Sequence, residues 1–279
     1  MKKTFLWIGV MTTLTLFNFV SQAGAHHVWL NATRYALESV KENPKAKTIL
    51  YFGWGDYFPA HDFLREGQIQ RLFLRNPDGA IQELKTPNAG FNETPIEFTQ
   101  DGIYVAAASL EPKFVADVWR DGKMEVILKP KDELPQGAEI LESKYGLQFA
   151  KAIVTVGQPD PKDATFLQPV GHDLEIIPLV NPRTLREGDY FPFKLLFKGE
   201  ALKAPQADPK IYATYAGFST GKGVFASTAE LSKGGIVRLK LVRYGVWQIH
   251  VEYSMPPPSE MAQKADKVEY KASLTFEIP

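Results

Sequence analysis

The chain has 279 residues, with 32 basic and 32 acidic side chains and no cysteine. Without residues 1–25, which carry two lysines and no acid, 254 residues remain, with 30 basic and 32 acidic side chains and a net charge of about −2. This balance excludes a nucleic-acid partner and an anionic membrane surface as electrostatic targets. The absence of cysteine excludes disulfides and a lipoprotein anchor, so stability must come from burial.

Residues 1–25 have the organisation of a secretory signal peptide. Two lysines precede an apolar run over residues 5–20, and Ala23 and Ala25 form an A-x-A cleavage site. Polar residues interrupt the apolar run, and nothing later in the chain is long enough to span a bilayer. We therefore expect a mature periplasmic chain without direct membrane insertion.

Cleavage after Ala25 would place His26 first and His27 second in the mature chain. A terminal histidine chelates a metal through its α-amine and a ring nitrogen, and His27 adds an imidazole and a backbone nitrogen. Such nitrogen-rich sites favour Cu(II) or Ni(II) in tetragonal geometry, and Co(II) or Zn(II) in tetrahedral geometry. The alternative is that the two histidines merely begin a strand, with one of them packed beside Trp29.

The stretch YFGWGDYFPAHDF, residues 51–63, is the best source of further ligands. His61 is the third candidate ligand. Asp56 or Asp62 would supply an oxygen ligand, or a carboxylate that orients an imidazole. Two other interpretations stay open: aromatics packed into the core with the charges solvated, or a platform of aromatic rings for sugars.

Strand patterns dominate the chain, as short alternating apolar runs bounded by Gly, Pro, Asn and Asp. One segment, residues 138–150, shows a helical period instead. We expect a mostly β protein made of two immunoglobulin-like antiparallel β-sandwich domains. The prolines and glycines of residues 156–171 interrupt the pattern, which predicts a first domain over 26–157, a linker over 158–171 and a second domain over 172–279.

Two further histidines lie on predicted strands of the second domain. His172 shares a strand face with Leu174 and Ile176, so a structural role in the core is expected, with a metal-ligand position as the alternative. In GVWQIHVEY the same alternation directs Trp247 to the core and predicts that His250 faces solvent.

Enzyme signatures are absent. The sequence has no G-x-S-x-G elbow, no H-E-x-x-H, no P-loop and no cysteine nucleophile, so we expect no enzymatic activity. A copper oxygenase built on a terminal histidine chelate is a third, less favoured possibility.

Several motifs give the chain a resemblance to a family of exported proteins of unknown function that are described as periplasmic components of cobalt or nickel uptake systems. The resemblance implies a C-terminal immunoglobulin-like domain and roles for His26, Trp29, His172, Glu175 and Trp247, with His26 as a ligand and Trp247 in the core. The chain departs from the family where many members have histidine directly after a glycine, since Asp56 stands there and the histidine is His61. The motifs are AHHVWL, GWGDYFPAHDF, GHDLEIIPLVNP, LREGDYFPFKLLFKGEAL and YGVWQIHVEY.

Together these patterns predict periplasmic binding of a divalent transition metal, nickel or cobalt first and copper next, for a membrane uptake transporter. The predicted ligand positions are His26, His27, His61, Asp56, Asp62 and His172. The competing prediction is a carbohydrate- or protein-binding β-sandwich module of the cell envelope.

Overall fold

The computed structural model describes residues 26–85 and 90–279. The predicted signal peptide, residues 1–25, lies outside the described residues. Within the described part the chain forms strands and four short 3-10 turns but no α-helix, which confirms the predicted mostly β class. This part contains no helix of the length and apolarity needed to cross a bilayer.

The strands in chain order are β1 (His27–Ala32), β2 (Ala36–Leu37), β3 (Lys47–Gly55), β4 (Ile69–Arg75), β5 (Ile81–Glu83), β6 (Thr94–Glu97), β7 (Gly102–Leu110), β8 (Lys113–Arg120), β9 (Lys123–Ile127), β10 (Glu139–Val156), β11 (Leu174–Pro178), β12 (Tyr190–Phe197), β13 (Glu200–Ala201), β14 (Lys210–Tyr215), β15 (Ser227–Ala229), β16 (Ile236–Lys240), β17 (Gly245–Met255) and β18 (Lys267–Ile278). The 3-10 turns are Lys131–Glu133, Thr165–Leu167, Pro182–Thr184 and Ser259–Met261.

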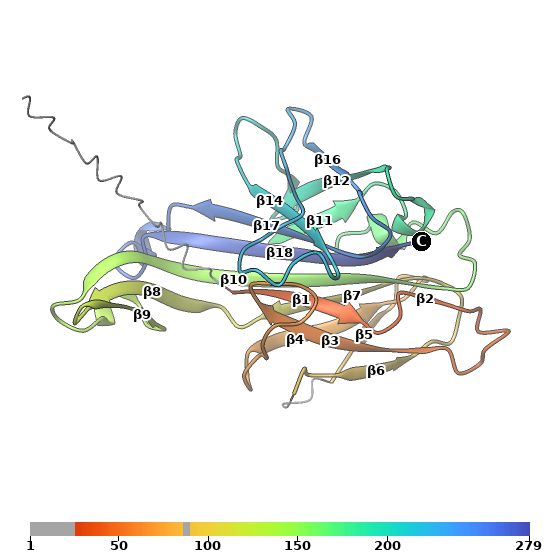
Figure 1. Cartoon of the computed structure of the whole chain (residues 1–279), viewed down its shortest axis with the longest axis horizontal. Coiled ribbons are helices and arrows are strands. Elements are labelled where there is room, and N and C mark those ends of the chain that lie inside the picture. The colour runs from red at the N-terminus through yellow and green to blue at the C-terminus, as the bar shows by residue number, and fades with distance from the viewer. Residues whose placement is uncertain (1–25, 86–89) are drawn as a thin grey trace, which may run out of the picture.

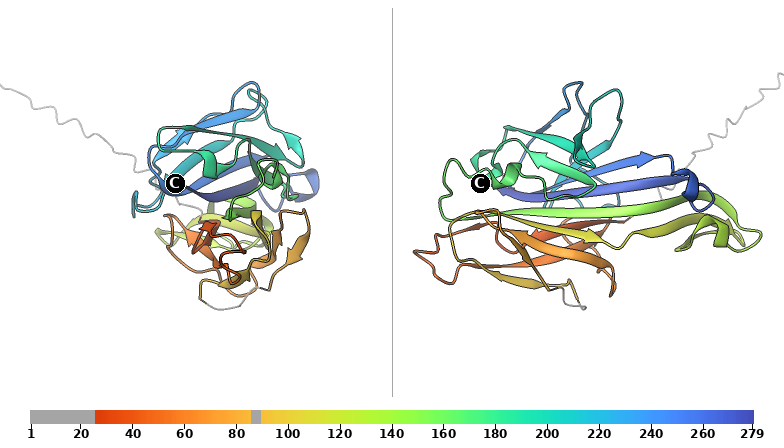
Figure 2. Two further views of the ribbon diagram at one scale, coloured as in Figure 1. Left: turned by 90° about the vertical axis from the view of Figure 1, so that its right-hand side faces the viewer. Right: turned by 180° about the vertical axis from the view of Figure 1, so that it is seen from behind.

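The strands build three layers, which are seen end-on in the left view of Figure 2. The central layer is an 11-stranded sheet that contains β4, β7, β10, β18, β17 and β14. A three-stranded sheet, β1-β3-β6, covers one face, and a four-stranded sheet of β11, β12, β13 and β16 covers the other. The molecule therefore contains two β-sandwiches that share their middle sheet, as the predicted sandwich class requires.

Strand β10 shows why the shared sheet has a core on each face. Successive side chains of a strand point to opposite faces. Phe149 and Ile153 enter the core under β11 and β12, whereas Ala150 and Val154 enter the core above β1 and β3. Because β10 is apolar on both faces in its second half, this segment can only lie in the middle of three layers.

Strand β10 also joins the two halves of the chain. It pairs with β7 of the first half in antiparallel fashion and with β18 of the second half in parallel, over Lys144–Ala152. In Figure 1, β10 and β18 run side by side through the middle of the molecule. The predicted division at 158–171 as a boundary between self-sufficient domains stays a prediction.

The predicted helix over residues 138–150 is wrong, because this segment is the first part of β10. It pairs with β8 from Glu139 to Gly146 and with β18 from Lys144 onward, so its backbone is hydrogen-bonded in the sheet. Leu141, which the helical pattern placed with the buried residues, is 51% exposed. Tertiary pairing overrode a short helical period.

The prediction that His250 faces solvent is also wrong. Trp247, Ile249 and Val251 do enter the core, so the alternation was read correctly. The opposite face of β17 is covered as well, because the start of β1 lies against it, and His250 is 2% exposed. Its ring stacks on that of His27, with 4.0 Å between the ring centroids.

Candidate functional site

His26 and Asp56 meet because of the register between β1 and β3. The ladder pairs His27 with Gly55 and Val28 with Trp54, so extending it by one residue places His26 opposite Asp56. The His26 Nε2 atom lies 3.5 Å from Asp56 Oδ2. Asp56 is buried and His26 is partly exposed, so the carboxylate forms the floor of the site and the imidazole forms its edge.

Gln148 of β10 fixes the start of β1 on the central sheet. Its Oε1 accepts a hydrogen bond from the Val28 N–H at 3.0 Å, and its Nε2 donates to the His26 carbonyl at 3.2 Å. These two bonds hold the backbone on both sides of His27. The position of the His26 ring is therefore set by the sheet as well as by the β3 ladder.

The loop after β3 folds back and brings His61 to the same place. The Asp62 N–H donates to the Trp54 carbonyl at 2.9 Å, which closes the loop. The His61 ring stacks on Tyr57 at 4.0 Å and lies 5.9 Å from the His26 ring, measured between centroids. Gly55 permits this approach, because a Cβ there would lie 2.3 Å from His61 Nδ1.

The hydrogen bond made by His61 determines its tautomer. The Asp56 backbone N–H donates to His61 Nδ1 at 2.9 Å. A backbone N–H is always a donor, so Nδ1 carries no proton, and the proton of the neutral ring lies on Nε2. In this arrangement His61 offers a hydrogen-bond donor to the site and has no lone pair free for a metal.

Lys222 completes the cluster from a loop that is distant in sequence. Its Nζ atom lies 3.5 Å from Asp56 Oδ2, and the Gly223 N–H donates to the Asp56 carbonyl at 3.4 Å. Asp56 therefore faces two partners, the Lys222 ammonium and the His26 ring. Lys222 does not stand out in the sequence, where the glycines on either side of it are its only distinctive feature.

Burial lowers the pKa of His26, and His61 and Lys222 lower it further, while Asp56 and Asp62 act in the opposite direction. The net effect favours a neutral imidazole at neutral pH. A neutral ring retains the lone pair that metal coordination requires.

Asp62 lies near His26 without an ion pair to it. Its Oδ1 accepts the Phe63 N–H at 2.8 Å, and its carboxylate raises the pKa of His26 only from a distance. Of the two predicted carboxylates, Asp56 is the one that faces the imidazole.

His27 points away from this cluster because neighbouring residues of a strand face opposite sides. It is buried between Trp29, at 5.0 Å, and His250, at 4.0 Å between centroids. Burial, followed by the neighbouring His250, holds its pKa well below the usual value. The His27 imidazole is therefore not brought together with His26 and His61.

His172 lies on the other face of the central sheet. Its ring stacks on Phe149 at 5.0 Å, inside the core that covers that face. Glu175, beside it, accepts from the Lys151 ammonium at 2.8 Å and from the Val170 N–H at 2.7 Å. These buried contacts hold the strand β11 region onto β10, so the structure places His172 and Glu175 in the core.

The aromatic rings of residues 51–63 are mostly engaged. Phe58 is buried, and one face of Tyr57 carries the His61 ring. The Lys113 ammonium lies 4.7 Å from the centre of the Trp54 ring. Phe63 is the exception, at 49% exposed. A stacking platform for a sugar needs several open ring faces, so this arrangement disfavours it.

A cleft of about 510 Å³ opens directly beside His26. The β8–β9 hairpin and the first part of β10 form much of it, and these segments extend beyond the sandwiches at the left of Figure 1. Its lining includes His26, Asp62 and Lys222, so the cleft and the histidine cluster share residues.

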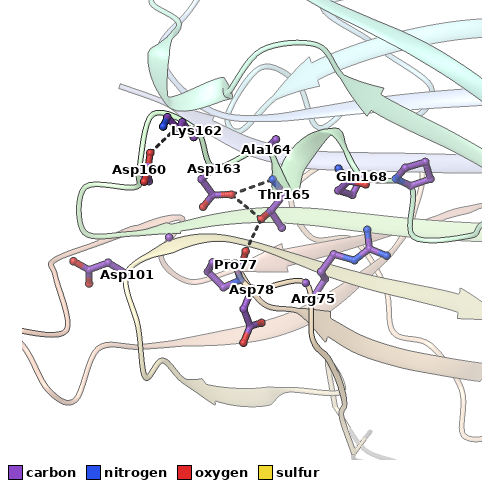
Figure 3. A pocket seen from close by; sticks show the side chains of 13 residues that line it. Arg75, Pro77, Asp78, Asp101, Asp160, Lys162, Asp163, Ala164, Thr165 and Gln168 are labelled. Atoms are coloured by element: carbon purple, nitrogen blue, oxygen red, sulfur yellow. Dashed lines mark hydrogen bonds between the residues drawn. The ribbon is translucent and has the colours of Figure 1, made fainter.

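A second pocket, of about 680 Å³, lies beyond the C-terminal end of β10 and is shown in Figure 3. Its carboxylates already serve the fold. Asp163 accepts from the Ile103 N–H and from Thr165, and Asp101 accepts from Ser39 and Val40. The Asp163–Ile103 bond attaches the segment after β10 to the first half of the chain, and the Asp101 bonds hold two segments of that half together.

Among residues 26–85 and 90–279, no group of three or more His, Asp or Glu side chains is arranged to hold a metal ion by itself. The cluster beside the cleft brings together His26, Asp56 and His61 of the predicted ligands, with Asp62 nearby. It leaves out His27 and His172.

Comparison with known proteins gives a family but no activity. A family model described as "Domain of unknown function (DUF4198)" matches residues 23–255. No curated protein matches the chain.

Several solved structures match the chain at low identity and with low TM-scores. A tetra-tandem repeat from the extending region of a large adhesion protein is 11% identical, with a TM-score of 0.21, over 91% of this chain and 50% of that one. The D0-D1 domain of Intimin is 10% identical, with a TM-score of 0.21, over 89% and 97%. The fibronectin(III)-like modules of Clostridium thermocellum CbhA are 8% identical, with a TM-score of 0.19, over 89% and 94%. This chain thus spans half the length of the adhesion-protein structure.

Proposed function

The chain belongs to the DUF4198 family, and since that family is described only as a domain of unknown function, we propose from the site that the protein binds a divalent transition metal ion. The ion is nickel or cobalt first and copper next. It binds at the amino terminus that removal of residues 1–25 would create.

The orientation of the His26 ring carries this proposal. Its Nε2 faces Asp56 Oδ2 at 3.5 Å, which leaves Nδ1, the nitrogen nearer to the backbone, for coordination. A free α-amine on the same residue closes a six-membered chelate ring with Nδ1. Two nitrogens from one residue suit nickel, cobalt and copper better than magnesium or calcium.

Asp56 serves as the orienting carboxylate in this proposal. A metal-bound histidine usually donates its other ring N–H to a carboxylate or carbonyl, which fixes the tautomer and strengthens the ligand. Asp56 is buried against the His26 ring and has this position. His61, with its proton on Nε2, donates a hydrogen bond to an oxygen bound to the metal and is not itself a nitrogen ligand.

In this proposal the protein is a periplasmic carrier. It delivers the ion to a membrane uptake transporter and catalyses no reaction. Binding of this type is reversible with pH, because protons compete for the α-amine and the imidazole. The lowered pKa of His26 reduces that competition at neutral pH.

Calorimetry with Ni(II), Co(II) and Cu(II) tests the proposal on two forms of the protein. One form begins at His26 with a free α-amine, and the other carries an acetyl group on that amine, which removes its lone pair from coordination. We expect the first form to bind at least about a hundredfold more tightly, since a nitrogen ligand is lost in the second. Equal affinity of the two forms would exclude the terminal site.

Asp56→Asn and Asp62→Asn form a matched pair of carboxylate variants in the same loop. Loss of an orienting carboxylate lowers metal affinity about tenfold to a hundredfold, so Asp56→Asn should weaken binding and Asp62→Asn should change it little. If neither form of the protein binds any of the three ions, the competing function as a binding module of the cell envelope is favoured.

A further inference from the structure

The protein supplies too few donors to surround a metal ion. In the proposed site only His26 coordinates directly, with Asp56 and His61 acting through hydrogen bonds, and the described residues hold no three-ligand cluster. Nickel and cobalt take four to six ligands, so other molecules must fill the remaining positions. The cleft of about 510 Å³ beside His26 is far larger than one ion with its waters and has the size of a small-molecule site.

The charged side chains that line this cleft differ in whether they form ion pairs. Lys144 is paired with Glu142 and Glu269, and Lys222 is paired with Asp56. Arg65 and Lys113 also line the cleft, as do Asp62, Glu111 and Asp117, and in the described part of the chain none of these five side chains forms an ion pair.

The two unpaired cations line the same cleft. Burial lowers the pKa of Lys113, and the charge of Arg65 lowers it further. Lys113 is held above the Trp54 ring, at 4.7 Å from its centre, so its ammonium has a fixed place at the cleft wall. An anionic group between Arg65 and Lys113 would relieve their repulsion, and a carboxylate fits the planar guanidinium.

Part of the cleft lining is apolar and partly open to solvent. Met124, Val126 and Leu128 form it along and just after β9, and they are 39%, 58% and 54% exposed. An inorganic anion would leave this apolar surface in contact with water, whereas the carbon skeleton of an organic acid would cover it.

We propose that the cleft receives the metal as a complex with a small organic carboxylate chelator, one carboxylate of which binds between Arg65 and Lys113 while the metal is held at His26. This inference rests on the proposed function and names the form in which the ion arrives.

Equilibrium dialysis with isotopically labelled citrate, malate and L-histidine tests the proposal on the protein that begins at His26. Each compound is dialysed alone and in a one-to-one mixture with Ni(II), and nickel is measured in parallel without any chelator. We expect at least one labelled compound to be retained near one molecule per chain, and only when Ni(II) is present.

The double variant Arg65→Gln/Lys113→Gln should retain at least about tenfold less labelled compound, because charge-assisted hydrogen bonds to the carboxylate are lost. Its affinity for Ni(II) alone should be unchanged. Lys129→Gln is the matched control, because Lys129 is exposed next to Leu128 without lining the cleft. A melting temperature within a few degrees of the parent protein checks the fold of each variant, and Arg65→Gln alone, at an exposed position, gives the same direction of effect.

The outcomes separate the two proposals. Binding of Ni(II) with no retention of any labelled compound overturns the chelator and leaves the metal site standing. Retention that does not depend on Ni(II) overturns the metal complex and leaves an anion site. If Ni(II) binds neither alone nor together with a chelator, the proposed function fails, and the chelator proposal fails with it.

Discussion

The side chains of His26 and Asp56 face each other just past the end of the β1–β3 ladder, with 3.5 Å between Nε2 and Oδ2. Thirty residues separate them in sequence, but strand register makes them neighbours. A ladder that is fixed by backbone hydrogen bonds places side chains more reliably than a flexible loop does. The imidazole and the carboxylate therefore keep their relative position before any ion arrives.

Gly55→Ala should disrupt the cluster from within. The backbone at Gly55 has φ of +135°, and an added Cβ would meet the His61 ring at 2.3 Å. We expect a loss of stability of about 2 kcal/mol or more, as strain and steric conflict combine. Urea denaturation measures it, and the His61 ring resonances should move.

Gly67→Ala is the matched control for Gly55→Ala. Gly67 also has a positive φ, of +73°, but a Cβ there meets nothing within 4 Å. Only the backbone cost of about 1 kcal/mol remains at that position. If both variants lower the free energy of unfolding equally, the steric conflict with His61 contributes nothing to the effect of Gly55→Ala.

Lys222→Met should tighten nickel binding. The Lys222 ammonium lies 3.5 Å from Asp56 Oδ2 and repels a metal cation at His26. The lysine side chain is largely exposed, so solvent screens much of its effect, and we expect a gain in affinity of about two- to fivefold. Lys233→Met, an exposed lysine outside the cluster, serves as the comparison, and weaker binding by Lys222→Met would contradict the prediction.

Glu175→Gln should strongly destabilise the fold. The Lys151 ammonium is buried with Glu175, at 2.8 Å, and the variant leaves that charge without its partner. Breaking a buried pair from one side costs about 3–5 kcal/mol. The double variant Lys151→Met/Glu175→Leu should be more stable than Glu175→Gln, as measured by thermal unfolding. The reverse order would rule out the unpaired charge as the cause.

Acid should destabilise the protein partly through His172. Burial, and then the charge of Lys151, lower the pKa of His172 to about 3, with Glu175 opposing them. In the unfolded chain the pKa is about 6.5. Because the folded value is lower, the unfolded state binds the proton first, and stability falls as the pH drops from 6.5 towards 3.

Between pH 7 and pH 5 this histidine should cost about 2 kcal/mol. His172→Phe keeps a ring against Phe149 and removes the titration. The variant should lose less stability over this pH range than the parent protein, in urea titrations at both pH values. An identical loss in the two proteins would place the acid sensitivity elsewhere.

Strand alternation predicted the mostly β class and the core positions of Trp247 and Leu174 because burial of one strand face has a strict period. The same reasoning failed at His250, where a second layer covers the face that would otherwise meet solvent. It failed at 138–150 because the pairing of β10 with β8 and β18 outweighed a local pattern. Layer number depends on contacts distant in sequence, and those have no periodic signature.

The candidate site was predicted in part. His26, Asp56 and His61 stood out as ligand types near a new terminus, and the fold brings them together. Lys222 and the cleft lining did not stand out, because a lone lysine in a glycine-rich turn resembles any solvated charge. The tautomer of His61 was also beyond reach, since it depends on one backbone N–H.

The parallel ladder between Lys144–Ala152 and Lys267–Thr275 makes the halves interdependent. Proteolytic cleavage within residues 158–171 should yield two polypeptides that stay associated through the shared sheet. If the two polypeptides are purified separately and then mixed, they should reassemble into the native structure. Heat should melt the nicked and the intact forms in a single transition each. The covalent linker is thus not needed to hold the two halves together, because the pairing of β10 with β18 does so.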